Sequence, residues 1–416
     1  MSPKIITILV VLLPGSALVN EGEFFSKENS SDLKVFTKNF SKLCTDLRTK
    51  GIERPDFLNR LLKVDGYLLS WFQTFDQLES GTLEDIGSYL TSVLSPSDFE
   101  YLTIGGESAI FSGKDGGREE VVKAIYPQES QGPSREFFIW LKIWNSNRNV
   151  VTEPYECALS NAVVYFIQEK MEGNLLSLAE KEIRAKPFPV SSLVDIMLKM
   201  SRCVEAVHSS GVVHYDIKLP NFLYSRQPPA GTNGKNGEVS VKITDFGASN
   251  FLKGLSNGST ILYKSPEVFI KDKGGYSSDV FSLGISFWHL VEAEEKAELT
   301  DADADEPKVV DECDLYEISW ILNSMKSKRS STDFSPIEAK MSNCHSKRVS
   351  KMKADFETVK QANAPQSQTY DSLVSLIERM TSYDAESRPA IDVVISELEA
   401  LKVGQEKSTG KDSNII

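Results

Sequence analysis

Apolar residues recur at helical spacing in the first hundred residues of the chain. Members of one series lie three or four residues apart, which places them on a single face of a helix. This series consists of Leu33, Phe36, Phe40, Leu43 and Leu47. Residues 55–72 form a second helical candidate, and Thr82 is a suitable N-cap for a third. The pattern predicts a helical region over residues 31–95.

The pattern changes at about residue 98. Three runs have the composition of strands and are bounded by Gly, Pro or Asn; they cover residues 101–113, 119–127 and 161–171. Residues 134–145 have helical spacing, and residues 191–211 form a long periodic segment that ends in Gly. A strand-rich part is thus followed by a helix-rich part, and this order predicts an α+β fold.

Two segments of the chain look like insertions. Residues 225–238 are rich in Pro, Gly and Asn and predict a mobile surface loop. Residues 292–368 begin with an acidic run and continue with Lys- and Ser-rich stretches. Such charge runs favour disorder or a loose helical insert. The alternative is a docking surface for a partner.

The first seventeen residues have the order of a cleavable secretory signal. Lys4 precedes an apolar run at residues 5–13, and the small residues Gly15 and Ala17 follow it. This interpretation places the protein in the secretory pathway or outside the cell. The alternative is an N-terminal strand or short buried helix in a cytoplasmic protein. We expect no transmembrane segment, because the run is too short to span a bilayer and no longer one follows.

Three N-x-S/T sequons, at Asn29, Asn39 and Asn257, give secretion only weak support.

The composition is ordinary for a globular protein, with 40% hydrophobic and 25% charged residues. A net charge of −13 argues against a nucleic-acid partner, because phosphate binding needs an excess of Lys and Arg. The five cysteines include no C-x-x-C pair. This excludes the usual zinc spacing and gives no sign of a disulfide framework, so we expect free thiols.

The stretch "GVVHYDIKLPNFLY" (211–224) holds a polar centre between two apolar runs. Asp216 could act as a base toward an incoming hydroxyl group, and Lys218 could neutralise a transferring phosphoryl group. Asn221 and Asp245, the latter in "ITDFGAS" (243–249), would supply oxygen ligands of the kind that Mg²⁺ takes. Upstream, Lys123 on a strand needs a carboxylate, and Glu136 on the next helix can provide it. A buried Lys–Glu pair costs desolvation energy and therefore suggests a role beyond stability.

These motifs together resemble those of the eukaryotic protein kinase superfamily. The resemblance covers residues 98 to about 402. It rests on H-x-D-x-K-x-x-N from His214 to Asn221, on D-F-G at Asp245, and on "YKSPE", which ends in Glu267. It implies that Asp279 secures the backbone of the 214–221 loop and that Arg388 pairs with Glu267.

The fold implied by the resemblance is a bilobal kinase fold, in which a small β-rich lobe lies over a larger helical lobe and ATP lies in the cleft. A short helical region precedes it. Gln168 matches the gatekeeper, the residue before the hinge, and Glu169 to Met171 would offer backbone groups to adenine. The residues implied in ATP binding are Gly105, Gly106, Ile110, Val121, Lys123, Glu136, Glu169, Met171 and Leu223. Mg²⁺ would be held by Asn221 and Asp245.

The chain departs from the family pattern in two places. The glycine-rich loop keeps Gly105 but has Thr103 and Ser108 where glycines are usual, so we expect a weaker hold on the phosphates. Tyr215 stands where most members have an Arg that pairs with a phosphate on the activation segment, residues 245–267. A neutral side chain cannot form this pair. Every catalytic residue is kept, which favours an active enzyme.

Lys218 and Thr260 match the serine/threonine branch, where both contact the catalytic Asp. The resemblance therefore implies an ATP- and Mg²⁺-dependent protein serine/threonine kinase, with Ser and Thr hydroxyls of proteins as substrates. A kinase with the predicted secretory signal is similar to the secreted effector kinases of intracellular parasites. The alternatives are a catalytically inactive kinase-fold scaffold and a kinase of small molecules or lipids.

The expected domain division has four parts. These are a signal peptide at 1–17, a helical extension at 18–97, a kinase domain at 98–402 with the two insertions, and a polar tail at 403–416.

Overall fold

A computed structural model describes sixteen stretches of the chain. They are residues 29–46, 68, 99–104, 108–115, 117–126, 132–160, 163–183, 188–227, 238–252, 260–271, 274–291, 315, 318–319, 321–322, 335–362 and 367–411. The chain divides into two compact units, Met1–Arg148 with Thr152–Lys170 and Asn149–Val151 with Met171–Ile416. Each unit is treated by itself below.

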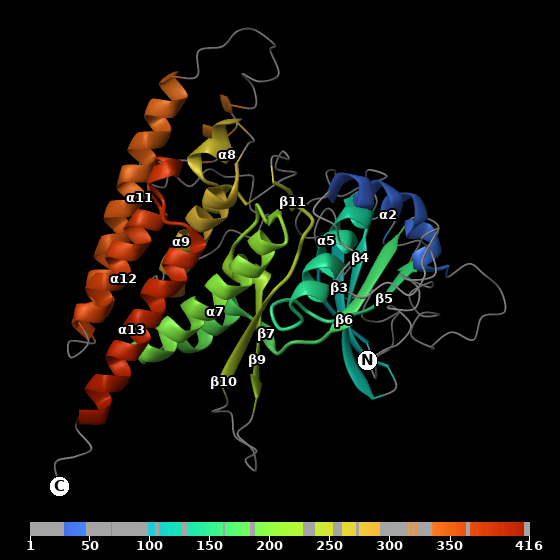
Figure 1. The fold of residues 1–416 in the computed structure, drawn as a ribbon, viewed down its shortest axis with the longest axis horizontal. Coiled ribbons are helices and arrows are strands. Elements are labelled where there is room, and N and C mark those ends of the chain that lie inside the picture. The colour runs from blue at the N-terminus through green and yellow to red at the C-terminus, as the bar shows by residue number, and fades with distance from the viewer. Residues whose placement is uncertain are drawn as a thin grey trace. The chain divides into compact units, whose positions relative to one another are not determined.

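The first unit is built on a six-stranded sheet in the order β1-β5-β6-β4-β3-β2 (Figure 1). Its strands are β1 (Thr45–Asp46), β2 (Phe99–Ile104), β3 (Ser108–Asp115), β4 (Arg118–Ile125), β5 (Pro154–Leu159) and β6 (Val164–Glu169). Burial alternates over residues 120–124 of β4, where Val122 and Ala124 are fully buried and Val121 and Lys123 are half-buried. This two-residue period is what a strand with one face on the core requires. The sheet agrees with the three strand-rich runs in the sequence.

Two helices complete this unit, α2 (Asn29–Leu43) and α5 (Gly132–Ser146). Phe36 and Phe40 of α2 are buried against α5, as the apolar series predicts. The helix ends at Leu43, and the chain then enters β1, which pairs parallel to β5. Leu47, most of residues 55–72 and the segment after Thr82 lie outside the described residues, although Leu68 is helical and buried.

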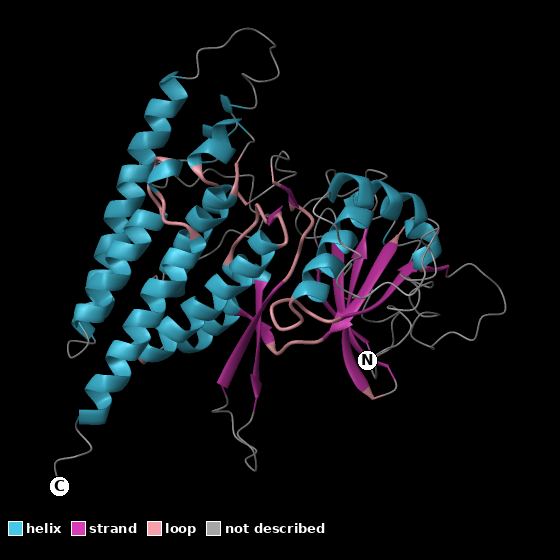
Figure 2. Cartoon of the chain, viewed as in Figure 1, coloured by secondary structure: helices cyan, strands magenta, loops and turns pink. Residues whose placement is uncertain are grey.

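The second unit is mainly helical (Figure 2). Its central helices are α7 (Val190–Ser209) and α9 (Tyr276–Val291), and α9 is buried on nearly all sides, as expected for a helix that is apolar all round. A Cβ on Gly284 of α9 would come within 2.8 Å of Thr381, so glycine is what permits this close approach. Gly211 ends the α7 segment with a φ of 76°, a conformation that suits glycine.

Short strands and further helices surround this core. The strands form the sheet β10-β9-β7 and the pair β11-β8, with β7 (Gly173–Asn174), β8 (Val212–Val213), β9 (Phe222–Gln227), β10 (Glu238–Ile243) and β11 (Asn250–Phe251). The other helices are α6 (Leu175–Leu178), α8 (Pro266–Lys271), α11 (Ser335–Ala362), α12 (Ser367–Met380) and α13 (Ile391–Lys411), with short 3-10 or π turns at Ala179–Ile183, Leu219–Asn221, Ile261–Tyr263 and Ala385–Ser387. Helix α13 continues past residue 402, into the segment expected to be a polar tail. Within the described residues, no helix is both long and apolar enough to cross a membrane.

The expectation of free cysteine thiols is wrong. Cys44 and Cys157 form a disulfide, and Cys344 is also disulfide-bonded, so among the cysteines that the structure describes only Cys203 carries the expected free thiol. Pairing partners can be far apart in sequence, here by 113 residues, and spacing rules do not detect them.

The structure describes part of each insertion, and the described part of the second is helical, which is one of its expected forms. In the first, residues 225–227 and 238 belong to the β9–β10 hairpin, because Ser225 pairs with Ser240 and Gln227 with Glu238. Residues 228–237 lie outside the described part of the chain. In the second, residues 335–362 form the continuous helix α11, which buries Ile337, Met341, Cys344, Met352 and Phe356. Within α11, charged residues such as Lys351 and Lys353 are exposed, and the acidic run that begins at residue 292 lies outside the described residues.

Candidate active site

The 214–221 loop is held by a buried carboxylate from α9. Asp279 is fully buried; its Oδ2 accepts the His214 N–H at 2.8 Å, and its Oδ1 accepts the Tyr215 N–H at 2.9 Å. His208, at the end of α7, lies 2.9 Å from the same carboxylate. Tyr215 has a φ of 64°, which is unusual for a residue with a Cβ and needs such fixed contacts. The predicted role of Asp279 as an anchor of this backbone is confirmed.

Asp216 lies at the centre of four contacts. Its Oδ1 accepts hydrogen bonds from the N–H and the Oγ1 of Thr260, at 2.9 and 2.8 Å. Its Oδ2 accepts one from Asn221 at 3.0 Å and lies 2.9 Å from the Lys218 Nζ. Lys218 in turn donates to the Thr260 hydroxyl at 2.7 Å. The predicted bridge from Thr260 to both Asp216 and Lys218 is therefore confirmed.

Asn221 and Asp245 lie at the same end of the β9–β10 hairpin. Phe222, which follows Asn221, pairs with Ile243 across the hairpin, and the Thr244 N–H donates to the Asn221 carbonyl at 3.0 Å. Asp245 follows directly with a φ of 66°. The Asn221 amide nitrogen is turned toward Asp216, so the amide group is oriented and its oxygen is the atom left for a hard cation.

In the described part of the chain, no group of three His, Cys, Asp or Glu side chains could hold a metal ion. The predicted pair contains one carboxylate and one amide, so it does not depend on such a group. Its role in metal binding stays a prediction.

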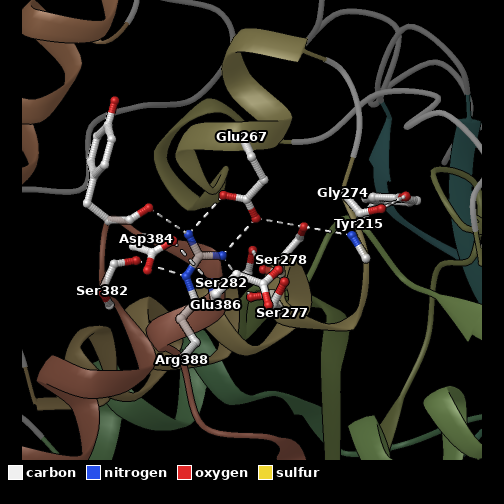
Figure 3. A network of polar contacts seen from close by, with 12 residues as sticks. Tyr215, Glu267, Gly274, Ser277, Ser278, Ser282, Ser382, Asp384, Glu386 and Arg388 are labelled. Atoms are coloured by element: carbon white, nitrogen blue, oxygen red, sulfur yellow. Dashed lines mark hydrogen bonds and ion pairs between the residues drawn. The ribbon is translucent and has the colours of Figure 1, made fainter.

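Tyr215 packs into a small apolar cluster. Its ring is 4% exposed and lies with Val213 and Val268, and Ala248 and Tyr276 cover this group. Its hydroxyl donates to the Gly274 carbonyl at 3.1 Å (Figure 3). Burial, followed by the nearby Asp279 carboxylate, raises the pKa of the phenol above its ordinary value. The side chain is thus a neutral packing element at this position.

Glu267 and Arg388 form the predicted ion pair. Two guanidinium nitrogens of Arg388 donate to the two Glu267 oxygens, at 2.7 and 2.8 Å (Figure 3). Ser278 adds a third hydrogen bond to Glu267 at 2.9 Å. Burial acts to raise the pKa of Glu267, but the hydrogen bonds and charge of Arg388 outweigh it and leave the pKa below its ordinary value. The pair joins α8 to the turn before α13.

The end of the activation segment is held by two helices. Ser282 of α9 donates to the Tyr263 carbonyl at 2.7 Å, and Arg348 of α11 donates to the Leu262 carbonyl at 2.7 Å. Ile261 and Leu262 pack on an apolar cluster formed with α11. The buried members of this cluster are Phe269, Leu315, Ile318, Leu322, Ile337, Met341 and Cys344. Sequence reasoning missed these contacts from Arg348 and Ser282, because each side chain lies far along the chain from the carbonyl it binds.

The first unit contains the other predicted residues. Lys123 Nζ lies 2.8 Å from Glu136 Oε1, so the predicted pair between β4 and α5 is confirmed. Ile110 lies opposite Lys123 in the β3–β4 pairing, and Val121 lies two residues before it. All three therefore share one face of the sheet.

The other residues predicted to contact ATP are less well placed for that role or lie outside the described residues. Gln168 is buried and accepts a hydrogen bond from Thr152 at 2.6 Å. The Glu169 N–H donates to the Glu153 carbonyl at 3.1 Å, so it is not a group that Glu169 can offer to adenine. Met171 and Leu223 belong to the second unit and are half-buried. Gly105 and Gly106 lie outside the described residues.

Known proteins resemble part of this chain. The chain is 26% identical over 177 residues to ribosomal protein S6 kinase alpha-6 of Homo sapiens, covering 41% of the chain and 22% of that protein. It is 29% identical over 152 residues to a Clostridium perfringens protein named "Probable serine/threonine-protein kinase", covering 35% of the chain and 20% of that protein. Each match thus spans about a fifth of the relative's length.

A model of the protein kinase domain matches residues 104–398, which is more than half of the chain. This region contains a β-sheet unit with Lys123 and Glu136 and a helical unit with Asp216, Asn221 and Asp245. The chain belongs to the protein kinase domain family.

Proposed function

We propose that this chain is an active protein serine/threonine kinase that transfers the γ-phosphoryl group of ATP to Ser and Thr hydroxyls of proteins. One observation carries the proposal: Thr260 contacts both Asp216 and Lys218, at 2.8 and 2.7 Å. This triad orients a carboxylate and an ammonium group within one loop. A base and a cation that act on the same hydroxyl group need this arrangement.

Asp216 is the base in this proposal. Its carboxylate accepts the proton of the substrate hydroxyl, and Asn221 and Thr260 fix the direction in which it points. Lys218 supplies a positive charge beside the oxygen that attacks. Thr260 holds that charge next to Asp216, so the two groups act on the same hydroxyl. Positioning and charge stabilisation of this kind are the main sources of catalysis in phosphoryl transfer.

ATP and Mg²⁺ fit the residues that the chain keeps. Asn221 and Asp245 would hold Mg²⁺, which neutralises phosphate charge when it is bound. Lys123, oriented by Glu136, would bind phosphate oxygens, and Ile110 and Val121 would contact adenine. In this proposal, backbone groups of the hinge from Glu169 to Met171 other than the Glu169 N–H would contact the base.

The proposal includes the serine/threonine branch. Thr260 and Lys218 match it, and one curated relative carries that activity in its name. The substrates would be proteins, since the P-E motif that ends in Glu267 is anchored by Arg388 as protein kinases require. No nucleic-acid partner is proposed.

Secretion is the second part of the proposal. The apolar run at residues 5–13 motivates it, and the disulfides of Cys44, Cys157 and Cys344 support it, because disulfides persist in oxidising compartments. Material purified from the native cell should lack Met1–Ala17 in its mass spectrum. An intact N-terminus would overturn this part.

The catalytic proposal is tested by Asp216→Asn. The change removes the charge of the base but keeps its size, so nucleotide binding should persist while phosphate transfer falls at least about a hundredfold. Transfer is measured with radiolabelled ATP and a protein substrate, and binding by calorimetry. Asp371→Asn makes the same change on an exposed carboxylate of α12 and should leave both quantities unchanged.

Two results would contradict the proposal. Retention of more than about a hundredth of the rate in Asp216→Asn would remove Asp216 from its role. Wild-type protein that binds Mg²⁺-ATP but transfers nothing to any protein would be an inactive kinase-fold scaffold, which the degenerate glycine loop favours.

A further inference from the structure

Helix α2 lies on helix α5 through a cluster of aromatic rings. The Phe36 ring centroid lies 5.1 Å from that of Phe138, and the Phe40 centroid lies 6.1 Å from that of Phe137. Phe137 stacks on Phe166 of β6 at 4.9 Å, which continues the cluster into the sheet. Edge-to-face and offset-stacked contacts between aromatic rings stabilise the packing beyond what burial of apolar surface alone contributes. The face of α5 that α2 covers is thus apolar and well packed.

A covalent bond ties the end of α2 to the sheet. Cys44 follows directly after α2 and is bonded to Cys157 of β5, with 4.6 Å between the two Cα atoms. Thr45 and Asp46 then pair parallel to Ala158 and Leu159. The disulfide closes a loop of 113 residues between two elements that touch α5 or its sheet. Without the disulfide, the end of α2 would be tied to β5 only through this short strand pairing.

Helix α5 presents Glu136 next to the covered residues Phe137 and Phe138. Consecutive residues of a helix point about 100° apart, so packing of the two rings fixes the rotation of the helix about its axis. That rotation determines whether the Glu136 carboxylate reaches Lys123, as it does here at 2.8 Å. Ser134 and Thr37 add a hydroxyl contact between the same helices at 3.3 Å.

We propose that α2 and the Cys44–Cys157 disulfide form a redox-sensitive lock on α5 that keeps Glu136 paired with Lys123. Phe36, Phe40, Cys44 and Cys157 are positioning residues for the nucleotide site, and they touch no substrate. The inference rests on the proposed function, because it assigns the Lys123–Glu136 pair to ATP binding. ATP affinity should depend on the oxidation state of this one disulfide.

Reduction opens the lock by ordinary thiol–disulfide exchange. A dithiol such as dithiothreitol breaks the sulfur–sulfur bond, and each cysteine sulfur gains one electron and one proton. The reagent loses two electrons and two protons and becomes a cyclic disulfide. Cys203 does not take part, because burial raises the pKa of its thiol to about 12.

The test compares the full chain with Cys44→Ser, Cys157→Ser and Cys203→Ser, each with and without dithiothreitol. The measured quantities are the Kd of Mg²⁺-ATP by calorimetry, the KM values of ATP and of a peptide substrate, and kcat. We expect Cys44→Ser and Cys157→Ser to bind ATP at least fivefold more weakly than wild type does. Their KM for the peptide should be unchanged. Dithiothreitol should weaken ATP binding by wild type and by Cys203→Ser to the same extent. It should have little effect on ATP binding by Cys44→Ser.

The disulfide of Cys344 is reduced in the same experiment, and the response of Cys44→Ser to dithiothreitol measures its share. A folded Cys44→Ser protein with wild-type ATP affinity would overturn the lock. An equal response of wild type and Cys44→Ser to the reductant would overturn it as well, since the sensitivity would then come from elsewhere.

A second variant covers the case in which the cysteine variants do not fold. Phe40→Leu keeps the disulfide and an apolar side chain but loses the ring contact with Phe137. It should raise the KM of ATP at least threefold without changing that of the peptide, and the amides of α5 should exchange hydrogen faster. Unchanged exchange and unchanged ATP binding would overturn the proposal. Hydrogen exchange also separates the two proposals, because it reports the lock even if the protein transfers no phosphate.

Discussion

Thr260 contacts both charged side chains of the 214–221 loop through one hydroxyl group. It accepts a hydrogen bond from Lys218 and donates one to Asp216, and its own N–H supplies a second bond to Asp216. The backbone bond survives any substitution that keeps the loop in place. The contribution of the hydroxyl can therefore be measured separately.

Thr260→Val replaces the hydroxyl by a methyl group of similar size. Hydrogen bonds to charged groups contribute about 1.5–3 kcal/mol, so we expect kcat to fall between about tenfold and a hundredfold. Thr260→Ser keeps the hydroxyl and should stay within about threefold of wild type. Steady-state kinetics with saturating ATP measures both variants. Equal loss in the two would mean that the methyl group, and not the hydroxyl, is what the site needs.

His345 of α11 gives the molecule a pH dependence that can be tested. It is half-buried, 6.0 Å from the Phe281 ring and 5.7 Å from the Tyr383 ring. Burial, and then the charges of Arg348 and Arg388, lower its pKa from 6.5 to about 4. Below pH 6.5 the unfolded chain binds a proton that the folded chain does not, so stability falls as the pH falls from about 6.5 to about 4.

Between pH 7 and pH 5 this loss should be about 2 kcal/mol in the free energy of unfolding. Urea unfolding of wild type and His345→Gln at the two pH values measures it, and the difference between the two proteins isolates His345. The glutamine variant should lose less stability over this range. An identical pH dependence would show that His345 titrates normally in the folded chain.

At the scale of elements, the sequence predicted features that depend on neighbouring residues better than contacts between elements far apart along the chain. Helices α5 and α7 were predicted from the helical spacing of their residues, and the Lys123–Glu136 pair because the next helix supplies a carboxylate for the strand lysine. Strand β5 was missed, since it begins with Pro154 and carries the polar Glu156. Spacing also could not pair Cys44 with Cys157, because no local rule links α2 to β5.

Helix α11 illustrates the same limit. Its Lys- and Ser-rich composition masks a stripe of widely spaced apolar residues, and only the fold shows which surface they cover. The sequence therefore located the insertion but not its contact with the activation segment. That contact is now the basis of a prediction.

Arg348→Ala removes the hydrogen bond from α11 to the Leu262 carbonyl. The carbonyl loses a charged donor, so the residues after Thr260 should be less well held and the KM of a peptide substrate should rise about fivefold or more. Lys at this position can still donate one bond, so Arg348→Lys should recover part of the loss. The KM of ATP should not change.

The matched control is Lys353→Ala on the same helix. Lys353 forms an exposed ion pair with Glu378, which contributes little. Kinetics with a peptide substrate should not distinguish this variant from wild type. A peptide KM for Arg348→Ala equal to that of the control would show that α11 does not position the segment.

On the scale of the whole molecule, the described end of the activation segment is held by groups of the protein itself. Thr260 is bonded to Asp216, Leu262 to Arg348 and Tyr263 to Ser282 and His289. The resemblance places Tyr215 where most kinases have an Arg, and its side chain is buried and neutral. We expect packing and hydrogen bonds to order the segment in place of an Arg–phosphate pair.

We therefore expect enzyme stripped of phosphate to keep most of its activity. A phosphate elsewhere on the segment would find no cation at Tyr215, so its charge could not order the segment through that residue. The described residues do not include Ser256 and Ser259, and Ser256→Ala is expected to be nearly silent. The measurement is the rate of peptide phosphorylation before and after phosphatase treatment, with the phosphatase removed and the phosphate content checked by mass spectrometry. A loss of tenfold or more that autophosphorylation restores would mean that another basic residue binds the phosphate, and the interpretation of Tyr215 as its neutral replacement would be wrong.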